Sequence, residues 1–222
     1  MVIATISFLG LTATHSVQAA DTQLILTWKA GTYAPIGFTG KLLPSSKSLV
    51  AVALSAFQSG KVMSLNNQMV RWYLNDRLVA NGVGKTIFLT ESPEIPGGDF
   101  TIRAEVPGLS GSTNARSVDI PNVSPHITLR PETAISSVRS LPLLLRTEPY
   151  YFNISDSSEL KFDWSVNGNA VATEENPNWL RLSLPKGAVG VPNSIAVAVR
   201  VSHGSILETA NLETMLRPGV AQ

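Results

Sequence analysis

The chain carries the stretch Trp72-Tyr73-Leu74-Asn75-Asp76-Arg77-Leu78-Val79-Ala80 and repeats it 92 positions later as Trp164-Ser165-Val166-Asn167-Gly168-Asn169-Ala170-Val171-Ala172. Trp, Asn, Val and Ala coincide between the copies. In each copy, residues around the Trp alternate in polarity, which predicts a strand with the Trp on its inward face. Asn-Asp and Asn-Gly then supply the positive-φ residues of a two-residue hairpin turn. Each copy therefore predicts a strand, a tight turn and a second strand.

The similarity extends outward from this hairpin in both directions. Later in each copy comes a clear period-two strand, at 100–106 and at 195–201, and shorter apolar segments precede each Trp. About seven short strands in roughly 95 residues, without a convincing helix, are typical of an immunoglobulin-like sandwich. We therefore expect an all-β chain with two tandem immunoglobulin-like β-sandwich domains, in which Trp72 and Trp164 belong to the structural core.

The N-terminus reads as a secretory leader. Residues 2–13 are apolar, and Val17-Gln18-Ala19 places small residues at the −3 and −1 positions of a cleavage site. No Lys or Arg precedes the apolar stretch, so a buried first strand or short helix stays open as the alternative. About 12 apolar residues are too few for a membrane span, which needs roughly 20. We expect a secreted protein, located in the extracellular space, the periplasm or at the cell surface.

These observations predict a five-part organisation. Prolines at both ends of Pro121-Asn122-Val123-Ser124-Pro125 stiffen the connection between the two copies. The expected parts are a signal peptide at 1–19, a first Ig-like or PKD-like domain at 20–121, a Pro-bounded linker at 122–125, a second Ig-like domain at 126–217 and a C-terminal tail at 218–222.

Composition excludes several classes of function. The 222 residues include 17 Lys and Arg against 16 Asp and Glu, a net charge of +1, so no field attracts nucleic acid. The chain has no cysteine, which rules out disulfides, thiolate zinc sites, iron–sulfur clusters and a thiol nucleophile. Each sandwich must therefore be stabilised by packing alone.

No set of residues suggests catalysis. His126 is expected in the linker and His203 in a hairpin turn, and no sequence pattern pairs either with a nucleophile. The carboxylate pairs Asp156/Glu159 and Glu174-Glu175 lack the alternating ligands and glycine of a calcium loop. We expect no enzyme, no catalytic residue, no metal site and no cofactor, with a weak calcium contact at the domain junction left open.

Three aromatic residues are candidates for contact with a ligand or partner. Tyr150 and Tyr151 follow Pro149, and Trp179 follows a polar Asn-Pro-Asn turn. Exposed on a β-sandwich, such rings stack on sugars or anchor a protein partner. The alternative is that Trp179, together with Tyr151 or Phe152, fills the core of the second domain.

The runs Trp72–Asp76, Asn81–Gly84 and Gly97–Ile102 resemble PKD-like and related bacterial Ig-like domains. The whole chain resembles small, exported, tandem Ig-like bacterial proteins of uncharacterised function. It lacks the Trp-Asp-Phe-Gly-Asp-Gly type of stretch found in PKD domains. The resemblance implies fold and export, and it transfers no functional residue.

Two hypotheses for function follow. The first is a non-catalytic exported or cell-surface module that contacts an envelope protein, or serves as a spacer or subunit of an envelope or pilus-type assembly. Open edge strands would permit strand addition to such a partner. The alternative is a carbohydrate-binding module, or an accessory domain of a secreted enzyme system, that binds a glycan through Tyr150, Tyr151 and Trp179.

Overall fold

The computed structural model describes residues 22–109, 114–132, 143–173, 176–183 and 194–216. The predicted leader and tail, and Glu174-Glu175, lie outside these residues. The regular secondary structure of the described chain is almost wholly strand, with single turns of 3-10 helix at Ser157–Glu159 and Ile206–Glu208. The strands of what we call the first sandwich are β1 (Thr22–Ala30), β2 (Leu49–Gln58), β3 (Lys61–Met63), β4 (Met69–Leu74), β5 (Arg77–Val83), β6 (Ile87–Glu91), β7 (Gly98–Glu105) and β8 (Ala115–Asn122).

The second sandwich repeats this plan. Its strands are β9 (His126–Pro131), β10 (Leu143–Tyr150), β11 (Lys161–Val166), β12 (Asn169–Val171), β13 (Trp179–Leu182), β14 (Ile195–Ser202) and β15 (Thr209–Leu216). A single turn of 3-10 helix at Ile206–Glu208 separates β14 from β15, so the last strand begins at Thr209.

Strand order identifies the two sandwiches as copies of one fold. In the first, β1 and β6 flank β2, and the facing sheet has the order β5-β4-β7-β8. In the second, β9 and β13 flank β10, and the facing sheet has the order β12-β11-β14-β15. All these pairings are antiparallel. The all-β sandwich fold expected from the sequence is therefore the fold of the protein.

The two core tryptophans occupy matching environments. Trp72 is fully buried and stacks on Phe88 with ring centroids 5.4 Å apart, and Trp164 is 3% exposed. The indole N–H of Trp72 donates to the carbonyl of Lys85 at 2.7 Å. That of Trp164 donates to the carbonyl of Pro177 at 2.8 Å, again 13 residues downstream. Each copy thus satisfies its buried indole in the same way.

The two hairpin turns have the backbone that their residues predict. Asn75 and Asp76 have φ of 47° and 61°, and Asn167 and Gly168 have φ of 50° and 79°. Each Asn also ties the turn to the neighbouring strand of its sheet. Its side-chain oxygen accepts a hydrogen bond at 2.9 Å from a backbone N–H, of Thr101 or Ala196 respectively.

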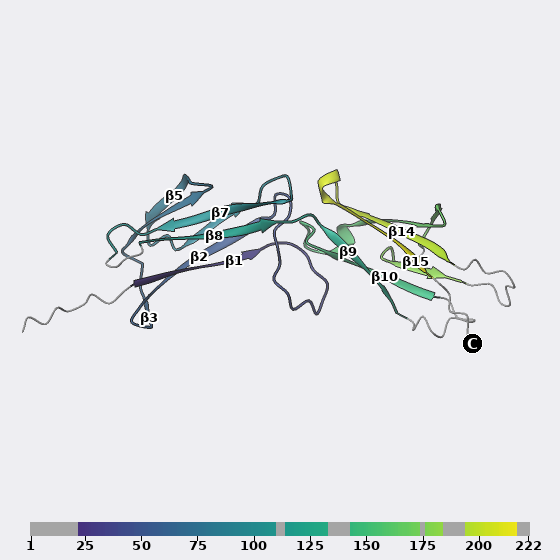
Figure 1. Ribbon diagram of the computed structural model, residues 1–222, viewed down its shortest axis with the longest axis horizontal. Coiled ribbons are helices and arrows are strands. Elements are labelled where there is room, and N and C mark those ends of the chain that lie inside the picture. Colours follow the sequence, from purple (N-terminus) through teal and green to yellow (C-terminus); the bar gives the residue numbers. More distant parts are fainter. Residues whose placement is uncertain (1–21, 110–113, 133–142, 174–175, 184–193, 217–222) are drawn as a thin grey trace, which may run out of the picture.

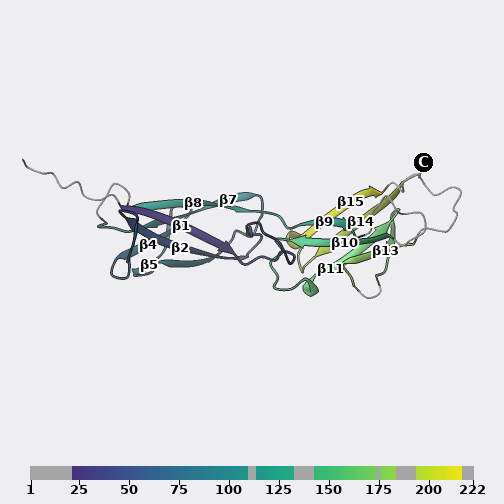
Figure 2. The ribbon, with the colours of Figure 1, turned by 90° about the horizontal axis from the view of Figure 1, so that it is seen from below.

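The sandwiches lie end to end, with β1 starting at one end of the molecule and β15 finishing at the other (Figures 1 and 2). Asn122, which the sequence analysis places in the linker, pairs with Gly98 as the last residue of β8. Its buried side-chain amide donates to the carbonyls of Pro93 and Ile95. The connection between the sandwiches is therefore only Val123–Pro125.

A loop of the first sandwich also holds the junction. The chain between β1 and β2, residues 31–48, extends to the second sandwich (Figure 1). Tyr33 donates its N–H to the carbonyl of Phe152 and accepts from the N–H of Tyr151, at 2.9 and 2.7 Å. The Tyr33 side chain packs against the core of the second sandwich. The proline-bounded linker is thus accompanied by a second, non-covalent connection.

Candidate functional site

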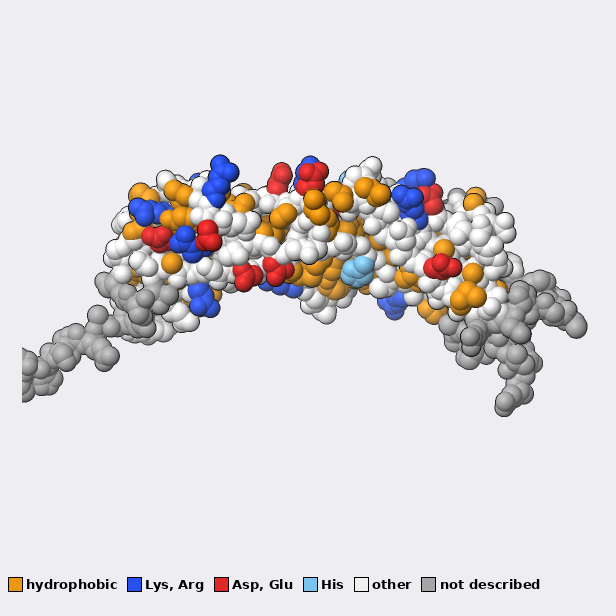
Figure 3. All heavy atoms as spheres, turned by 45° about the horizontal axis from the view of Figure 1, so that its top comes forward, with side chains coloured by type: hydrophobic (Ala, Val, Ile, Leu, Met, Phe, Trp, Pro, Cys, Tyr) orange, Lys and Arg blue, Asp and Glu red, His pale blue; other side chains and the backbone are white. Residues whose placement is uncertain are grey.

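Tyr150 and Tyr151 lie in a ring cluster at the junction. The cluster consists of Phe38, His126, Tyr150 and Tyr151, and we call it the junction aromatic cluster. The His126 ring stacks on Tyr150 with centroids 4.9 Å apart and planes 6° apart. Phe38 meets Tyr150 and Tyr151 edge-on, at 5.6 and 6.2 Å. Apolar side chains fill this middle part of the surface beside a histidine (Figure 3). Phe38 belongs to the first sandwich and the other three rings belong to the second. The two tyrosines therefore take part in a ring contact that joins the sandwiches.

A buried carboxylate, Glu148, and its arginine partner adjoin this cluster. The Tyr150 hydroxyl donates to Glu148 at 3.2 Å, and Arg130 pairs with the same carboxylate at 3.3 Å. Glu148 is 7% exposed, so these contacts compensate a buried charge. Partial burial lowers the pKa of His126, which favours the neutral imidazole near neutral pH.

Glu208 is a second buried carboxylate at the junction. Its Oε2 accepts from the N–H of Asn153 at 3.0 Å, and its Oε1 accepts from the Ser45 hydroxyl at 3.5 Å. Ser45 belongs to the loop of the first sandwich, so this carboxylate joins both sandwiches. Burial raises the pKa of Glu208, against the opposing effects of the Asn153 N–H, the nearby His203 and the Ser45 hydroxyl.

Trp179 occupies a different part of the second sandwich, at the start of β13. It pairs with Arg146 of β10, whose guanidinium lies 5.7 Å from the ring centroid. Tyr150 lies four residues further along β10, about 13 Å away at the usual rise of a strand. The structure therefore separates Trp179 from the two tyrosines with which the sequence analysis grouped it.

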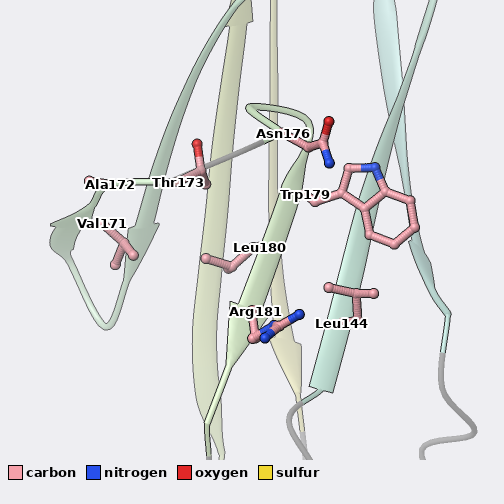
Figure 4. Close-up of a pocket in the computed structure, with 8 residues that line it drawn as sticks. All are labelled: Leu144, Val171, Ala172, Thr173, Asn176, Trp179, Leu180 and Arg181. Atoms are coloured by element: carbon pink, nitrogen blue, oxygen red, sulfur yellow. The ribbon is translucent and has the colours of Figure 1, made fainter.

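The half-buried Trp179 lines a pocket of about 560 Å³ beside the edge strand β13 (Figure 4). The side chains of Thr173, Asn176 and Arg181 make no hydrogen bond or ion pair with any residue the structure describes. Figure 4 shows the Asn176 amide directed toward the Trp179 indole. The pocket is lined by Leu144, Val171, Ala172, Thr173, Asn176, Trp179, Leu180 and Arg181.

The first sandwich carries an apolar surface at the equivalent strand. Ile87 and Leu89 of β6 are 61% and 60% exposed, and they correspond to Trp179 and Arg181 at the 92-residue offset. Leu49 of β2, on the same outer face, is 52% exposed. We call this surface the β6 face, and it consists of Leu49, Ala51, Ala53, Ile87 and Leu89. The sequence analysis missed it, although comparing outward positions between the two repeats would have revealed it.

The carboxylates considered for a metal have local structural roles. The Asp156 side chain accepts from the N–H of Ser158, and Glu159 accepts from the N–H groups of Ser155 and Asp156. The Ser158 hydroxyl and N–H lower the pKa of Asp156, and the Asp156 N–H with the hydroxyl and N–H of Ser155 lower the pKa of Glu159. Asp156 and Glu159 form a capping box around the 3-10 turn. Within the described ranges, no three or more His, Asp or Glu side chains gather into a potential metal site.

Among the residues that the structure describes, no helix has the length and apolarity needed to cross a membrane.

No protein-family model matches the chain, and no curated protein matches it. Among solved structures, the three N-terminal domains of the highly immunogenic outer capsid protein Hoc of bacteriophage RB49 align with 12% identity and a TM-score of 0.40. That alignment covers 88% of this chain and 59% of the phage chain. The chain thus spans less than two thirds of that neighbour.

Two further solved structures are similar at low identity. The fibronectin(III)-like modules of CbhA from Clostridium thermocellum align with 14% identity and a TM-score of 0.27, over 87% of this chain and 93% of theirs. The Bacteroides ovatus protein SGBP-B, solved with a mixed-linkage heptasaccharide, aligns with 15% identity and a TM-score of 0.26, over 92% of this chain and 49% of its own. The fold assignment rests on the strand order and register described above.

Proposed function

We propose that the chain is a non-catalytic, exported Ig-like module that binds an envelope protein through the β6 face. The observation that carries this proposal is the exposure of Leu49, Ile87 and Leu89, each more than half exposed, on adjacent strands of one sheet. Clustered apolar side chains on a soluble domain are typical of a surface that a partner covers.

The backbone of β6 supports the addition of a strand. Leu54 donates to the carbonyl of Thr86, and Ser92 donates to the carbonyl of Ser48, so even-numbered residues face β2. Because hydrogen-bonding direction alternates along a strand, Ile87, Leu89 and Glu91 direct their N–H and C=O groups to the open edge. Of the described strands, β2 alone pairs with β6. The partner that fits is an extended segment with alternating apolar side chains.

The second sandwich blocks the same kind of contact. At the position equivalent to Leu89 it has the exposed Arg181, and at the position equivalent to Ala53 it has Arg146. Charged side chains on an edge strand oppose pairing with another apolar strand. Partner binding is therefore assigned to the first sandwich, and the second sandwich extends the module away from it (Figure 1).

The test compares capture of envelope proteins by the purified wild type and by an Ile87→Lys/Leu89→Lys double variant. Two charges on the β6 face would have to be desolvated against an apolar partner, so we expect at least a tenfold loss of the captured protein. Met215→Lys is the matched control, because Met215 is 57% exposed on a strand of the second sandwich.

A photo-crosslinking amino acid at position 89 supplies the second measurement. We expect it to form an adduct with the same captured protein, while the same group at position 215 does not. Undiminished capture by the double variant, or equal crosslinking from both positions, would show that the β6 face is not the binding surface. Circular dichroism of each variant verifies that the sandwich is intact.

A further inference from the structure

We propose that the Trp179 pocket of the second sandwich binds a saccharide unit that carries a carboxylate, such as a uronic acid within a glycan. The pocket is independent of the β6 face, since its residues all belong to the second sandwich. Its volume of about 560 Å³ lies in the range of small-ligand sites, roughly 300–1,000 Å³.

The Trp179 indole differs from the indoles of the core tryptophans in its burial and in its hydrogen bonding. Trp72 and Trp164 are buried and donate their indole N–H groups to backbone carbonyls. Trp179 is half-buried, and its indole N–H has no acceptor among the described residues. An indole with an accessible face and a free donor suits a pyranose ring, which offers a flat array of C–H groups and hydroxyl acceptors.

Two neutral polar side chains complete the hydrogen-bonding groups. The Asn176 amide offers donors and an acceptor, and the Thr173 hydroxyl offers both. In Figure 4 the Asn176 amide lies on the same side of β13 as the Trp179 ring and Leu144, whereas Thr173 lies on the other side with Val171 and the buried Leu180. The Asn176 amide therefore adds polar groups beside the Trp179 ring and Leu144, a combination that is usual in a site that orients a polar ring.

Arg181 specifies the charge of the ligand. Two other arginines of this sheet already have carboxylate partners: Arg130 pairs with Glu148 at 3.3 Å and Arg146 with Glu132 at 3.9 Å. Arg181 lines the pocket, is exposed and has no ion pair with a described carboxylate. A guanidinium binds a carboxylate through two parallel N–H···O bonds, which gives both affinity and orientation.

The experiment is a calorimetric or NMR titration of the full chain. The probes are short oligouronides, containing galacturonate, glucuronate or mannuronate, and the methyl esters of the same oligomers. We expect at least one oligouronide to bind, with an affinity at least tenfold above that of its ester. Arg181→Gln should remove this preference, and Trp179→Ala should remove binding of both forms.

Two matched variants separate a site effect from a general one. Arg200→Gln removes an exposed arginine of the second sandwich outside the pocket. Trp28→Ala removes a half-buried tryptophan of the first sandwich that also has a cation over its ring, the Lys41 ammonium at 3.3 Å. Both should bind the oligouronide like the wild type.

Several results would overturn the proposal. These are no binding by any oligouronide, equal binding of acid and ester, or unchanged binding by Arg181→Gln. Equal affinity for an acidic tripeptide, Ac-Glu-Glu-Glu-NH2, would show that the pocket recognises carboxylates without regard to the sugar ring. Because Arg181 is exposed and its replacement leaves the core intact, the test remains decisive even if Trp179→Ala fails to fold.

Discussion

At the scale of single residues, Glu208 shows how this molecule places a charge between two domains. The carboxylate is 6% exposed and bonds to groups that come from both sandwiches, Ser45 and Asn153. Burial is the largest effect on it and raises its pKa, so the protonated form is favoured in the native state more than in the unfolded chain. Its contribution to stability is therefore greatest at low pH and is lost as the pH rises through the raised pKa.

Glu208→Gln tests this relation. The neutral amide can still accept from the Asn153 N–H, and it carries no charge at any pH. We expect the variant to gain stability relative to the wild type as the pH rises from about 4 to about 8. The measurement is urea unfolding at several pH values. The exposed Glu213→Gln, on the following strand, should leave the pH dependence unchanged. Parallel stability curves for Glu208→Gln and wild type would contradict the prediction.

At the scale of elements, the hairpins β4–β5 and β11–β12 are fixed by their first turn residue. Asn75 and Asn167 adopt positive φ, and their side chains accept from the backbone N–H of the adjacent strand. The same residue therefore sets the turn geometry and ties the hairpin to the sheet that contains the core Trp.

Replacing Asn75 separates these two roles. Asn75→Gly keeps the positive φ but loses the hydrogen bond, so we expect a loss of about 1 kcal/mol in the free energy of unfolding. Asn75→Ala also places a Cβ in the left-handed region, so we expect about 2 kcal/mol. Denaturant unfolding followed by tryptophan fluorescence measures both, and Asn167 should give the same order.

Asn211→Ala, at an exposed strand position, is the control and should lie within about 0.5 kcal/mol of wild type. If Gly and Ala at position 75 were equally destabilising, the turn conformation would not contribute as stated.

At the scale of the whole molecule, the junction determines the mutual orientation of the sandwiches. The covalent connection is three residues, and the loop 31–48 adds the Tyr33 backbone bonds, the Phe38 ring contacts and the Ser45–Glu208 contact. Because these contacts come from three separate positions in the loop, we expect them to resist bending at the short linker. A stiff arrangement of this kind would suit the spacer role that we propose for the second sandwich.

Phe38→Ala tests the stiffness. The variant loses two edge-on ring contacts, each contributing about 0.5–1.5 kcal/mol, so we expect a wider range of interdomain angles. Small-angle scattering and NMR rotational diffusion of the two sandwiches measure this range. Ile36→Ala is the matched control, since Ile36 is fully exposed in the same loop. Unchanged diffusion anisotropy in Phe38→Ala would show that the Phe38 ring contacts do not contribute to the stiffness.

Much of the fold could be predicted because its signals are local. Period-two alternation around Trp72 and Trp164, and an Asn followed by Asp or Gly, specify strand and turn within ten residues. Because the chain contains this pattern twice, each copy supports the strands and turns predicted from the other. The candidate site was less predictable: Trp179 lies at a pocket, whereas Tyr150 and Tyr151 pack within the junction.

The sequence by itself determined the all-β class, the hairpins and the core tryptophans, because each depends on neighbours along the chain. The tertiary structure alone decided the junction and the Trp179 pocket. Ser45 and Glu208 are 163 residues apart, and no periodicity relates them. Alternation along a strand also does not distinguish an outward side chain that is covered by a partner from one that is exposed to water. Such contacts arise only when separate sheets pack, since packing brings together residues that the chain itself keeps apart.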